Sequence, residues 1–420
     1  MIATVSKPAK STTSDRGTLL HRELSSFSEF GTTTTMGQQA LGYDVPVYIN
    51  EFWTSKQRAA NRLHEISYRA CFKPQLPRFF IERLTKPGDV VFDPFMGRGT
   101  TLLEAALLGR VPVGCDANPL CERLISPRLH PPTVEQVEER LESILFHSSC
   151  EPADDLLVFY HPQTLRQLYA LKSYMADRQR SGAFDSIDAW IQMVAINRLT
   201  GHSKGFFSVY TLPPNQAVSV GSQRKINERL KQQPEFRSVP DLILAKTKSL
   251  LRDITPVLRE SIIAASEKAK IITTNCECVP ALESSSVDLI VTSPPFLNIV
   301  DYAADNWLRC WFIGMEPKAV QLDIQTKLVG WEASITRALK EMYRVLRPGG
   351  WIAFEVGELQ RGKVRLEEAV IPAGIKAGLN PVLVLINSQK FTKTSNCWGV
   401  GNNDLGTNTN RVVVFQKSER

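Results

Sequence analysis

The chain has 420 residues, of which 43% are hydrophobic and 22% are charged, and its formal net charge is +7. These fractions are typical of globular proteins, and the chain contains no uninterrupted apolar stretch of about eighteen residues that could span a membrane. The first residues lack the apolar segment of a secretory signal, so we expect a cytoplasmic protein with no membrane partner. The excess of positive charge suits a polyanionic partner, although many basic proteins have none.

The eight cysteines are scattered along the chain. Only Cys276 and Cys278 lie close together, and no second pair or neighbouring histidine completes a zinc-binding spacing. We therefore expect reduced, structural cysteines and no bound metal.

Four segments differ in their sequence patterns. Residues 1–45 are rich in Ser, Thr and Gly, and we expect a disordered arm because they contain few large apolar side chains. Residues 46–125 alternate strand-like and helix-like patterns, residues 126–268 have mainly amphipathic helical patterns, and residues 269–420 return to the alternation. We interpret 46–125 and 269–420 as two parts of one domain, and 126–268 as a helical insertion.

The predicted elements of this domain follow one another in a regular order. A helix over 78–84, a strand over 90–92, a helix over 100–109 and a strand over 111–116 come first. After the insertion, strands are expected over 271–274, 288–293, 351–357, 381–387 and 411–416. This succession predicts a Rossmann-like, doubly wound α/β fold with a mostly parallel sheet and a large helical insertion after its second strand. Ligands of such sheets bind at the carboxyl ends of the strands.

The loop after the first strand is Asp93-Pro94-Phe95-Met96-Gly97-Arg98-Gly99-Thr100-Thr101. Glycines here let the backbone approach a ligand, and the start of the next helix offers free N–H groups. Asp93 closes its strand and can hold the ammonium group of an amino-acid moiety. Asp116 closes the second strand, where it either accepts both hydroxyls of a ribose or caps the following helix.

A second motif, Thr292-Ser293-Pro294-Pro295-Phe296, directly follows an apolar strand. Its two prolines make the segment stiff and remove two backbone donors. An exocyclic amine of a nucleobase is a poor nucleophile because its lone pair is delocalised into the ring. Hydrogen bonds from that amine to Ser293 Oγ and to the Pro294 carbonyl favour its pyramidal, nucleophilic form, and Phe296 offers a ring on which the base can stack. The alternative is a plain turn that ends the strand.

Together, the two motifs resemble those of the DNA amino-methyltransferase family, and Ser-Pro-Pro-Phe resembles its cytosine-N4 branch. The adenine-N6 enzymes usually have Asp or Asn in the place of Ser293. The resemblance covers roughly residues 70–120 and 270–420, and it implies a seven-stranded methyltransferase fold that uses S-adenosyl-L-methionine as methyl donor. The implied donor-binding residues are Phe72, Lys73, Pro74, Asp93, Pro94, Phe95, Gly97, Gly99, Thr100, Thr101, Asp116, Asn118, Asn275 and Cys276, and the implied catalytic residues are Ser293, Pro294, Pro295 and Phe296.

Two features depart from the family pattern. The insertion separates the second and third strands, whereas the usual permutations place the target-recognition region elsewhere. Asn275 and Cys276 stand where the family has an acid or polar pair after the third strand. Asn275 therefore either contacts the adenine of the donor or simply ends its strand.

Further candidates for substrate contacts lie outside these motifs. Asn298, Asp301 and Tyr302 either line the pocket for the base or cap and pack the next helix. In the insertion, Lys204 can contact a phosphate, and Phe206 or Phe207 can fill the place of an extruded base. The alternative for Lys204, Phe206 and Phe207 is an ordinary connection between helices.

The sequence thus predicts methyl transfer from S-adenosyl-L-methionine to the N4 amine of cytosine in double-stranded DNA, without a covalent enzyme–base intermediate. Adenine-N6 methylation, guanine-N2 methylation of RNA and a non-catalytic DNA-binding or antirestriction role remain alternatives. A cognate restriction endonuclease is a further expected partner. The insertion and the polar segment over 387–410 are both candidates for reading the DNA sequence.

Overall fold

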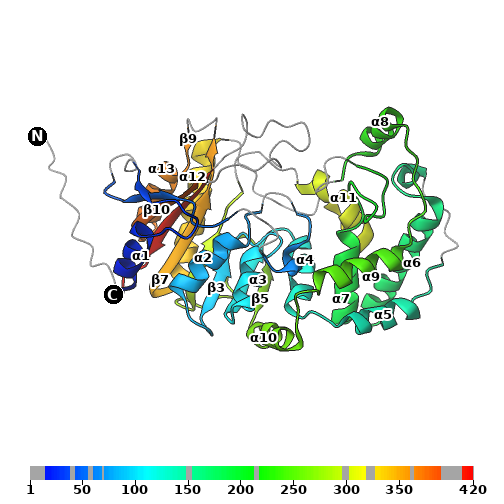
Figure 1. Cartoon of the computed structure of the whole chain (residues 1–420), viewed down its shortest axis with the longest axis horizontal. Helices are drawn as coiled ribbons and strands as arrows, with labels where there is room; N and C mark the ends of the chain where they lie inside the picture. Colours follow the sequence, from blue (N-terminus) through cyan, green and yellow to red (C-terminus); the bar gives the residue numbers. More distant parts are fainter. Residues whose placement is uncertain are drawn as a thin grey trace, which may run out of the picture.

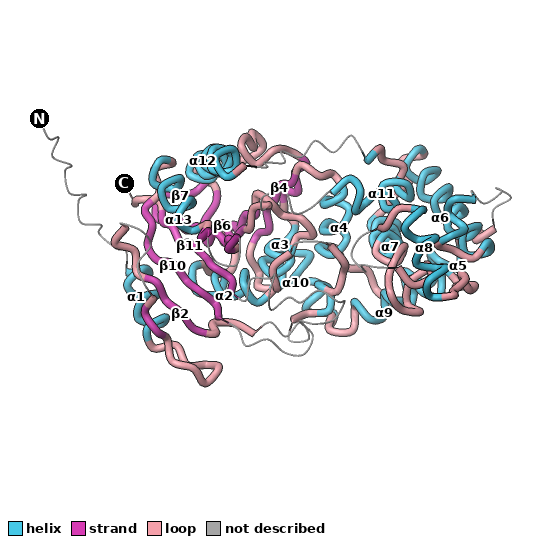
Figure 2. The backbone as a smooth tube through the Cα atoms, turned by 90° about the horizontal axis from the view of Figure 1, so that it is seen from above, coloured by secondary structure: helices cyan, strands magenta, loops and turns pink. Residues whose placement is uncertain are grey.

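The computed structural model describes residues 15–37, 43–54, 60–68, 71–147, 154–211, 217–295, 302–317, 327–359, 364–388 and 409–419. Within these residues, a β-sheet with helices on both faces lies beside a group of helices, as Figures 1 and 2 show from two directions. The chain enters the group of helices after the second strand of the predicted series and leaves it before the third. The α/β fold with a mostly parallel sheet and a helical insertion is therefore confirmed.

The described residues contribute nine strands to this sheet, in the order β1-β2-β10-β11-β7-β6-β3-β4-β5. They are β1 (Thr35–Met36), β2 (Val47–Asn50), β3 (Val90–Asp93), β4 (Val111–Asp116), β5 (Lys270–Thr273), β6 (Val287–Thr292), β7 (Leu346–Val356), β10 (Asn380–Ser388) and β11 (Thr409–Gln416). β11 is antiparallel to both of its neighbours and β1 is antiparallel to β2, whereas the other pairs are parallel. The short antiparallel pair of β8 (Glu358–Leu359) and β9 (Val364–Arg365) is separate from this sheet.

Apolar side chains alternate between the two faces of the sheet. On β6, Ile290 belongs to the apolar cluster beneath α12 (Leu328–Val345) and α13 (Glu367–Lys376). Its neighbour Val291 belongs to the cluster on the other face, beneath α2 (Gln75–Leu84). Successive side chains of a strand point to opposite faces, so a strand covered on both sides needs an almost continuous apolar run. Such runs are the signal that predicted these strands.

The chain order places a switch point between β3 and β6. From β3 the chain proceeds to β4 and β5 on one side, and it later returns to β6 and β7 on the other. The glycine loop joins β3 to α3 (Thr100–Leu107), and Ser293 directly follows β6. The two predicted motifs therefore lie at the same edge of the sheet, where parallel α/β sheets bind ligands.

Most of the remaining helices form a body beside the sheet, which we call the helical lobe (Figure 1). The helices that follow β4 are α4 (Leu120–Leu129), α5 (Val134–Ser143), α6 (Pro162–Arg180), α7 (Ser186–Ile196), α8 (Val220–Leu230), α9 (Val239–Leu250) and α10 (Pro256–Ser266). α11 (Tyr302–Ile313) comes after the Pro-Pro motif but packs in the lobe, where Trp307 and Trp311 contact its core. None of the described helices is both long and apolar enough to cross a membrane.

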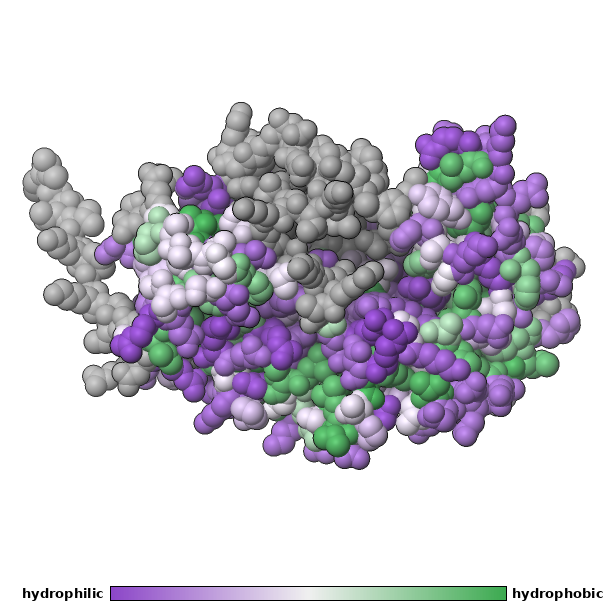
Figure 3. Space-filling model, viewed as in Figure 1, coloured by the Kyte–Doolittle hydropathy of each residue, from purple (hydrophilic) through white to green (hydrophobic). Residues whose placement is uncertain are grey.

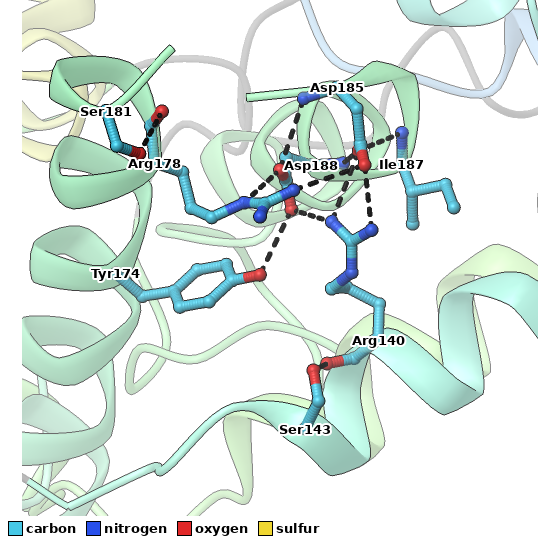
Figure 4. A network of polar contacts seen from close by, with 8 residues as sticks. All are labelled: Arg140, Ser143, Tyr174, Arg178, Ser181, Asp185, Ile187 and Asp188. Atoms are coloured by element: carbon cyan, nitrogen blue, oxygen red, sulfur yellow. Dashed lines mark hydrogen bonds and ion pairs between the residues drawn. The ribbon is translucent and has the colours of Figure 1, made fainter. Parts of the chain in front are cut away.

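A polar network joins three helices of the lobe (Figure 4). The fully buried Asp188 of α7 accepts hydrogen bonds from Arg178 Nε at 2.8 Å, from the Tyr174 hydroxyl at 3.4 Å and from Arg140. Asp185, which caps α7, accepts from Arg140 Nη2 at 2.7 Å and from Arg178 Nη2 at 3.2 Å. Loss of both arginines would leave the buried charge of Asp188 uncompensated. The network therefore fixes α5, α6 and α7 relative to one another.

The expectation of a disordered arm over residues 1–45 is corrected for the part that the structure describes. α1 (Asp15–Ser25) buries Leu20 and Leu24 in the apolar cluster beside α2. Leucines four positions apart share one face of a helix, so two of them dock a segment whose composition is otherwise polar. Composition averaged over the whole segment hid this spacing.

Candidate active site at the switch point of the sheet

The glycine loop between β3 and α3 requires glycine at two positions for different reasons. Gly97 and Gly99 have φ angles of 50° and 75°, in the left-handed region that favours glycine. A Cβ at Gly99 would lie 2.5 Å from Cγ1 of Ile125 on α4, so a side chain does not fit there. A Cβ at Gly97 would make only ordinary contact with the ring of Tyr68, at 3.5 Å. Gly99 therefore allows α4 to pack against the loop, whereas Gly97 is required by the backbone conformation itself.

Asp93 closes β3 and is almost fully buried, with 1% of its surface exposed. Its Oδ1 accepts hydrogen bonds from the Thr292 hydroxyl at 2.6 Å, across the switch point, and from the Phe95 amide at 3.1 Å. Burial raises the pKa of Asp93 to about 7 in spite of these bonds. No cation from the described residues pairs with this carboxylate. A buried, unpaired carboxylate fits the ammonium group of an amino-acid moiety, which would favour its ionised form.

Asp116 closes β4 and is held by two backbone amides. Its Oδ2 accepts from the Gly97 N–H and its Oδ1 from the Asn118 N–H, both at 2.9 Å. Burial raises the pKa of Asp116. A different side chain meets the first amide of α4: Asn118 Oδ1 accepts from the Leu120 N–H at 3.0 Å. Each carboxylate oxygen can accept a second hydrogen bond, so the two amides leave capacity for ribose hydroxyls.

The other residues predicted to bind the adenine side of the donor have local partners. Asn118 is buried, and its Nδ2 donates to the Tyr68 hydroxyl at 3.3 Å. Asn275 follows β5, and its Oδ1 accepts from the Glu277 N–H at 2.9 Å, which is the contact of a turn that ends a strand. Cys276 packs against the core on the α12 face. A contact between Asn275 and the donor stays a prediction.

The segment with the implied donor-binding residues Phe72, Lys73 and Pro74 lies near the glycine loop. Phe72 packs in the cluster beside α2, and Pro74 is the N-cap residue of that helix. Burial and the charge of Arg98 lower the pKa of Lys73, so the Lys73 ammonium lies near the arginine of the loop. Arg98 Nη1 in turn donates to the Ile66 carbonyl at 2.9 Å. This arginine ties the loop to the chain segment that precedes α2.

Both threonines at the start of α3 have structural partners. The Thr100 hydroxyl accepts from Arg98 Nε at 3.1 Å. The Thr101 hydroxyl donates to the Val291 carbonyl of β6 at 3.0 Å. The loop is thus joined to the neighbouring strand on the far side of the switch point.

The Pro-Pro segment leaves the sheet between β3 and β7. Its described residues are Ser293, Pro294 and Pro295. Trp331 Nε1 of α12 donates to the Pro295 carbonyl at 3.0 Å and holds the segment against that helix. The predicted residues outside the described part are Phe296, Asn298, Asp301 and the side chain of Tyr302.

A buried glutamate on β7, absent from the predicted residues, lies beside this segment. Glu355 is 6% exposed, forms a side-chain hydrogen bond with Ser293, and accepts from Asn410 Nδ2 of β11 at 3.0 Å. Burial raises its pKa. When ionised, Glu355 can only accept, so the Ser293 hydroxyl donates to it and keeps its lone pairs for an amine. The signal in the sequence was an acidic residue inside an apolar, buried strand, where carboxylates are rare.

The connection between α7 and α8 does not present its aromatic rings to DNA. Phe206 and Phe207 are 6% and 0% exposed, so their assignment as residues that fill the place of an extruded base is corrected. The Arg198 guanidinium lies over the Phe206 ring, with 4.0 Å between Cζ and the ring centroid. Two adjacent phenylalanines carry enough apolar surface to be drawn into the core of the lobe. Lys204, in the same connection, is exposed as a phosphate contact requires.

Residues 22–126 match a family model described as DNA methylase. The type II methyltransferase M.BsoBI of Geobacillus stearothermophilus is 23% identical over 279 residues, which are 61% of this chain and 53% of that protein. The type II methyltransferase M.MjaII of Methanocaldococcus jannaschii is 30% identical over 109 residues, 26% of this chain and 21% of that protein. The tRNA (guanine(10)-N2)-dimethyltransferase of the same organism is 38% identical over 61 residues, 14% of this chain and 17% of that protein.

These similarities support a relationship between the chain and the DNA amino-methyltransferases. The chain spans about half the length of M.BsoBI and about a fifth of M.MjaII. The range that matches the family model contains the glycine loop, Asp93 and Asp116, but it ends before the Pro-Pro segment. The roles of Ser293 and Glu355 therefore rest on their geometry and on the motif itself.

Proposed function

We propose that the chain transfers the methyl group of S-adenosyl-L-methionine to the N4 amine of cytosine in double-stranded DNA. The observation that carries the proposal is the hydrogen bond between Ser293 and Glu355 at the sheet edge that also holds Asp93. It supplies a hydroxyl acceptor for an amine and a buried base behind that hydroxyl. The Ser-Pro-Pro sequence supports cytosine as the base, because it resembles the cytosine-N4 branch of the family.

The residues at the switch point suit the methyl donor. Asp93 is a buried carboxylate with no cationic partner among the described residues, and it would hold the ammonium group. Asp116 orients the glycine loop and has acceptor capacity left for the ribose. When bound, the donor supplies an activated methyl group on a sulfonium sulfur.

Ser293 and Glu355 act on the amine of the extruded base. Ser293 Oγ and the Pro294 carbonyl accept its hydrogens, which directs the nitrogen lone pair at the methyl carbon. With the donor bound, transfer of its methyl group to the nitrogen would leave the sulfonium as a neutral thioether and the nitrogen with a surplus proton. That proton passes to Ser293 Oγ, whose own proton passes to Glu355. Positioning accounts for most of the rate, and the proton transfer contributes about 10²-fold to 10⁴-fold.

The experiment is incubation with labelled donor and mixed-sequence duplex DNA, followed by mass spectrometry of the nucleosides. We expect N4-methylcytosine from the wild type. We expect a much lower rate from Ser293→Ala, with donor affinity unchanged because Ser293 lies outside the donor loop. N6-methyladenine alone would mean that Ser293 does not decide the base.

A second candidate function has one observation in its favour. The 61-residue similarity to the tRNA (guanine(10)-N2)-dimethyltransferase favours an RNA amine as the substrate. Parallel incubations with tRNA and duplex DNA separate the two functions. Label in guanine of tRNA, with none in DNA, would contradict the proposed reaction.

A further inference from the structure

Positive charge is concentrated in one stretch of the helical lobe. Between residues 198 and 237 there are seven Lys or Arg residues and two Glu residues, so this stretch carries most of the net charge of +7. It contains α8, which Figure 1 shows at the upper end of the lobe. β9, which follows the carboxyl end of β7, lies on the same side of the molecule. The most basic part of the lobe and the candidate active site thus face the same side.

Polar contacts on one face attach α8 to the lobe. Gln223 Nε2 donates to the Tyr210 carbonyl at 3.0 Å, and Asn227 Nδ2 donates to the Val158 carbonyl at 2.8 Å. Lys225 and Arg229 each follow one of these residues by two positions, which is about 200° around a helix axis. Both are exposed. The basic pair is therefore directed away from the lobe and into solvent.

Apart from Val220, which packs against the core of the lobe, apolar packing accounts for little of the sequence of this helix. Gln223 is its buried residue, and Leu230 is 46% exposed. Arg224 pairs with the exposed Asp155 at 3.3 Å, but within the described part of the chain neither Lys225 nor Arg229 forms an ion pair. Basic residues near the end of a helix also interact with its dipole, but at an exposed site this contributes under about 1 kcal/mol. The charges are thus available to a polyanion.

We propose that the exposed face of α8, with Lys225 and Arg229, binds the phosphate backbone of the duplex whose base is held at the sheet edge. The inference rests on the proposed function, since it takes duplex DNA as the substrate. Figure 3 shows hydrophilic residues gathered over α8 at the upper right, as a phosphate-binding surface requires. Phosphate contacts fix the orientation of a duplex but carry no sequence information, so α8 positions the DNA and leaves sequence reading to other residues.

Two double variants of the full chain test this surface. Lys225→Gln/Arg229→Gln removes two charges from α8. The matched control, Lys268→Gln/Lys376→Gln, removes two exposed charges from the opposite edge of the sheet, just before β5 and β10. Affinity for a fluorescent mixed-sequence duplex is measured at a series of KCl concentrations. Each phosphate contact that is lost reduces the magnitude of the slope of log K against log salt concentration by about 0.9. In the α8 variant this magnitude should therefore be smaller by one or two times that amount.

The outcomes separate this inference from the proposed function. We expect a higher KM for DNA in the α8 variant, with kcat and donor affinity at the wild-type values, and a control variant like the wild type. Equal salt slopes in all three proteins would overturn the role of α8, while N4-methylcytosine in the same samples would still support the reaction. A wild type that methylates RNA and no DNA would overturn both.

Discussion

The substitution Asp93→Asn removes one charge from the switch point and keeps the hydrogen bonds that orient the side chain. The Thr292 hydroxyl, at 2.6 Å, and the Phe95 amide, at 3.1 Å, both donate to Oδ1, which asparagine retains. The variant therefore isolates the effect of the carboxylate charge. We expect a chain that is more stable near neutral pH and that binds the methyl donor poorly.

The sign and the size of the stability change follow from the pKa of Asp93. Burial raises this pKa from 3.8 to about 7, so the folded chain binds the proton more tightly than the unfolded chain does. Stability is then lost as the pH rises from the unfolded pKa through the folded one. At 1.36 kcal/mol per pKa unit, the ionised carboxylate lowers the free energy of unfolding by on the order of 4 kcal/mol. Asparagine does not ionise. The free energy of unfolding of the variant should therefore rise relative to that of the wild type as the pH increases from 3.8 to about 7.

Urea unfolding between about pH 5 and pH 8 measures the stability of both proteins, and titration calorimetry with S-adenosyl-L-methionine measures donor affinity. Wild-type affinity should weaken as the pH falls below about 7, because protonation removes the charge that holds the ammonium group. The variant should bind weakly at every pH. A variant no more stable than the wild type at pH 8, or one with wild-type donor affinity, would refute the reasoning.

Three other substitutions have defined outcomes. Glu355→Gln should lower kcat by about 10²-fold at unchanged donor affinity, and it should abolish the loss of kcat at acidic pH. A variant with wild-type kcat would exclude Glu355 as the proton acceptor. Asp116→Ala should weaken donor binding at least about tenfold in calorimetry, and unchanged affinity would limit this residue to shaping the loop. Gly99→Ala should lower the free energy of unfolding, measured with urea, by about 2 kcal/mol or more, because its Cβ meets Ile125. Gly182→Ala is the control, since Gly182 has a similar φ and open space around it. Equal losses of stability in both variants would contradict the packing argument.

The elements around the glycine loop were predictable because their signals act within a few residues. β3 begins at Val90 and β4 ends at Asp116, as the apolar runs and the acids that close them indicated. Glycines with positive φ and a short connection mark the start of α3. Most helices of the insertion were predictable for the same reason, since they combine an apolar periodicity with a cap.

Contacts between segments far apart in the sequence were not predictable from local signals. Glu355 meets Ser293 only because β7 lies beside β6, and this neighbour relation follows from the order of the whole sheet. Phe206 stands in a polar, glycine-containing loop that suggests exposure, yet the loop folds its ring beneath Arg198. Leu20 and Leu24 are only two residues, and it is the surface beside α2 that makes them a docking site for α1. In each case, the position of the side chain depends on a segment of the chain that is distant in sequence.

Asp93 and Glu355 share an electrostatic property that links stability to the proposed reaction. Both are buried acids on the two strands that flank β6, and burial raises the pKa of each. Such groups destabilise a fold when ionised, and they occur most often where function requires them. A cationic donor and an amine that gains positive charge both favour ionised acids at this edge. Through these two groups, falling pH is expected to favour the folded chain and to remove charges that the proposed reaction needs, so methyl transfer should decline at acidic pH even where these two acids stabilise the fold.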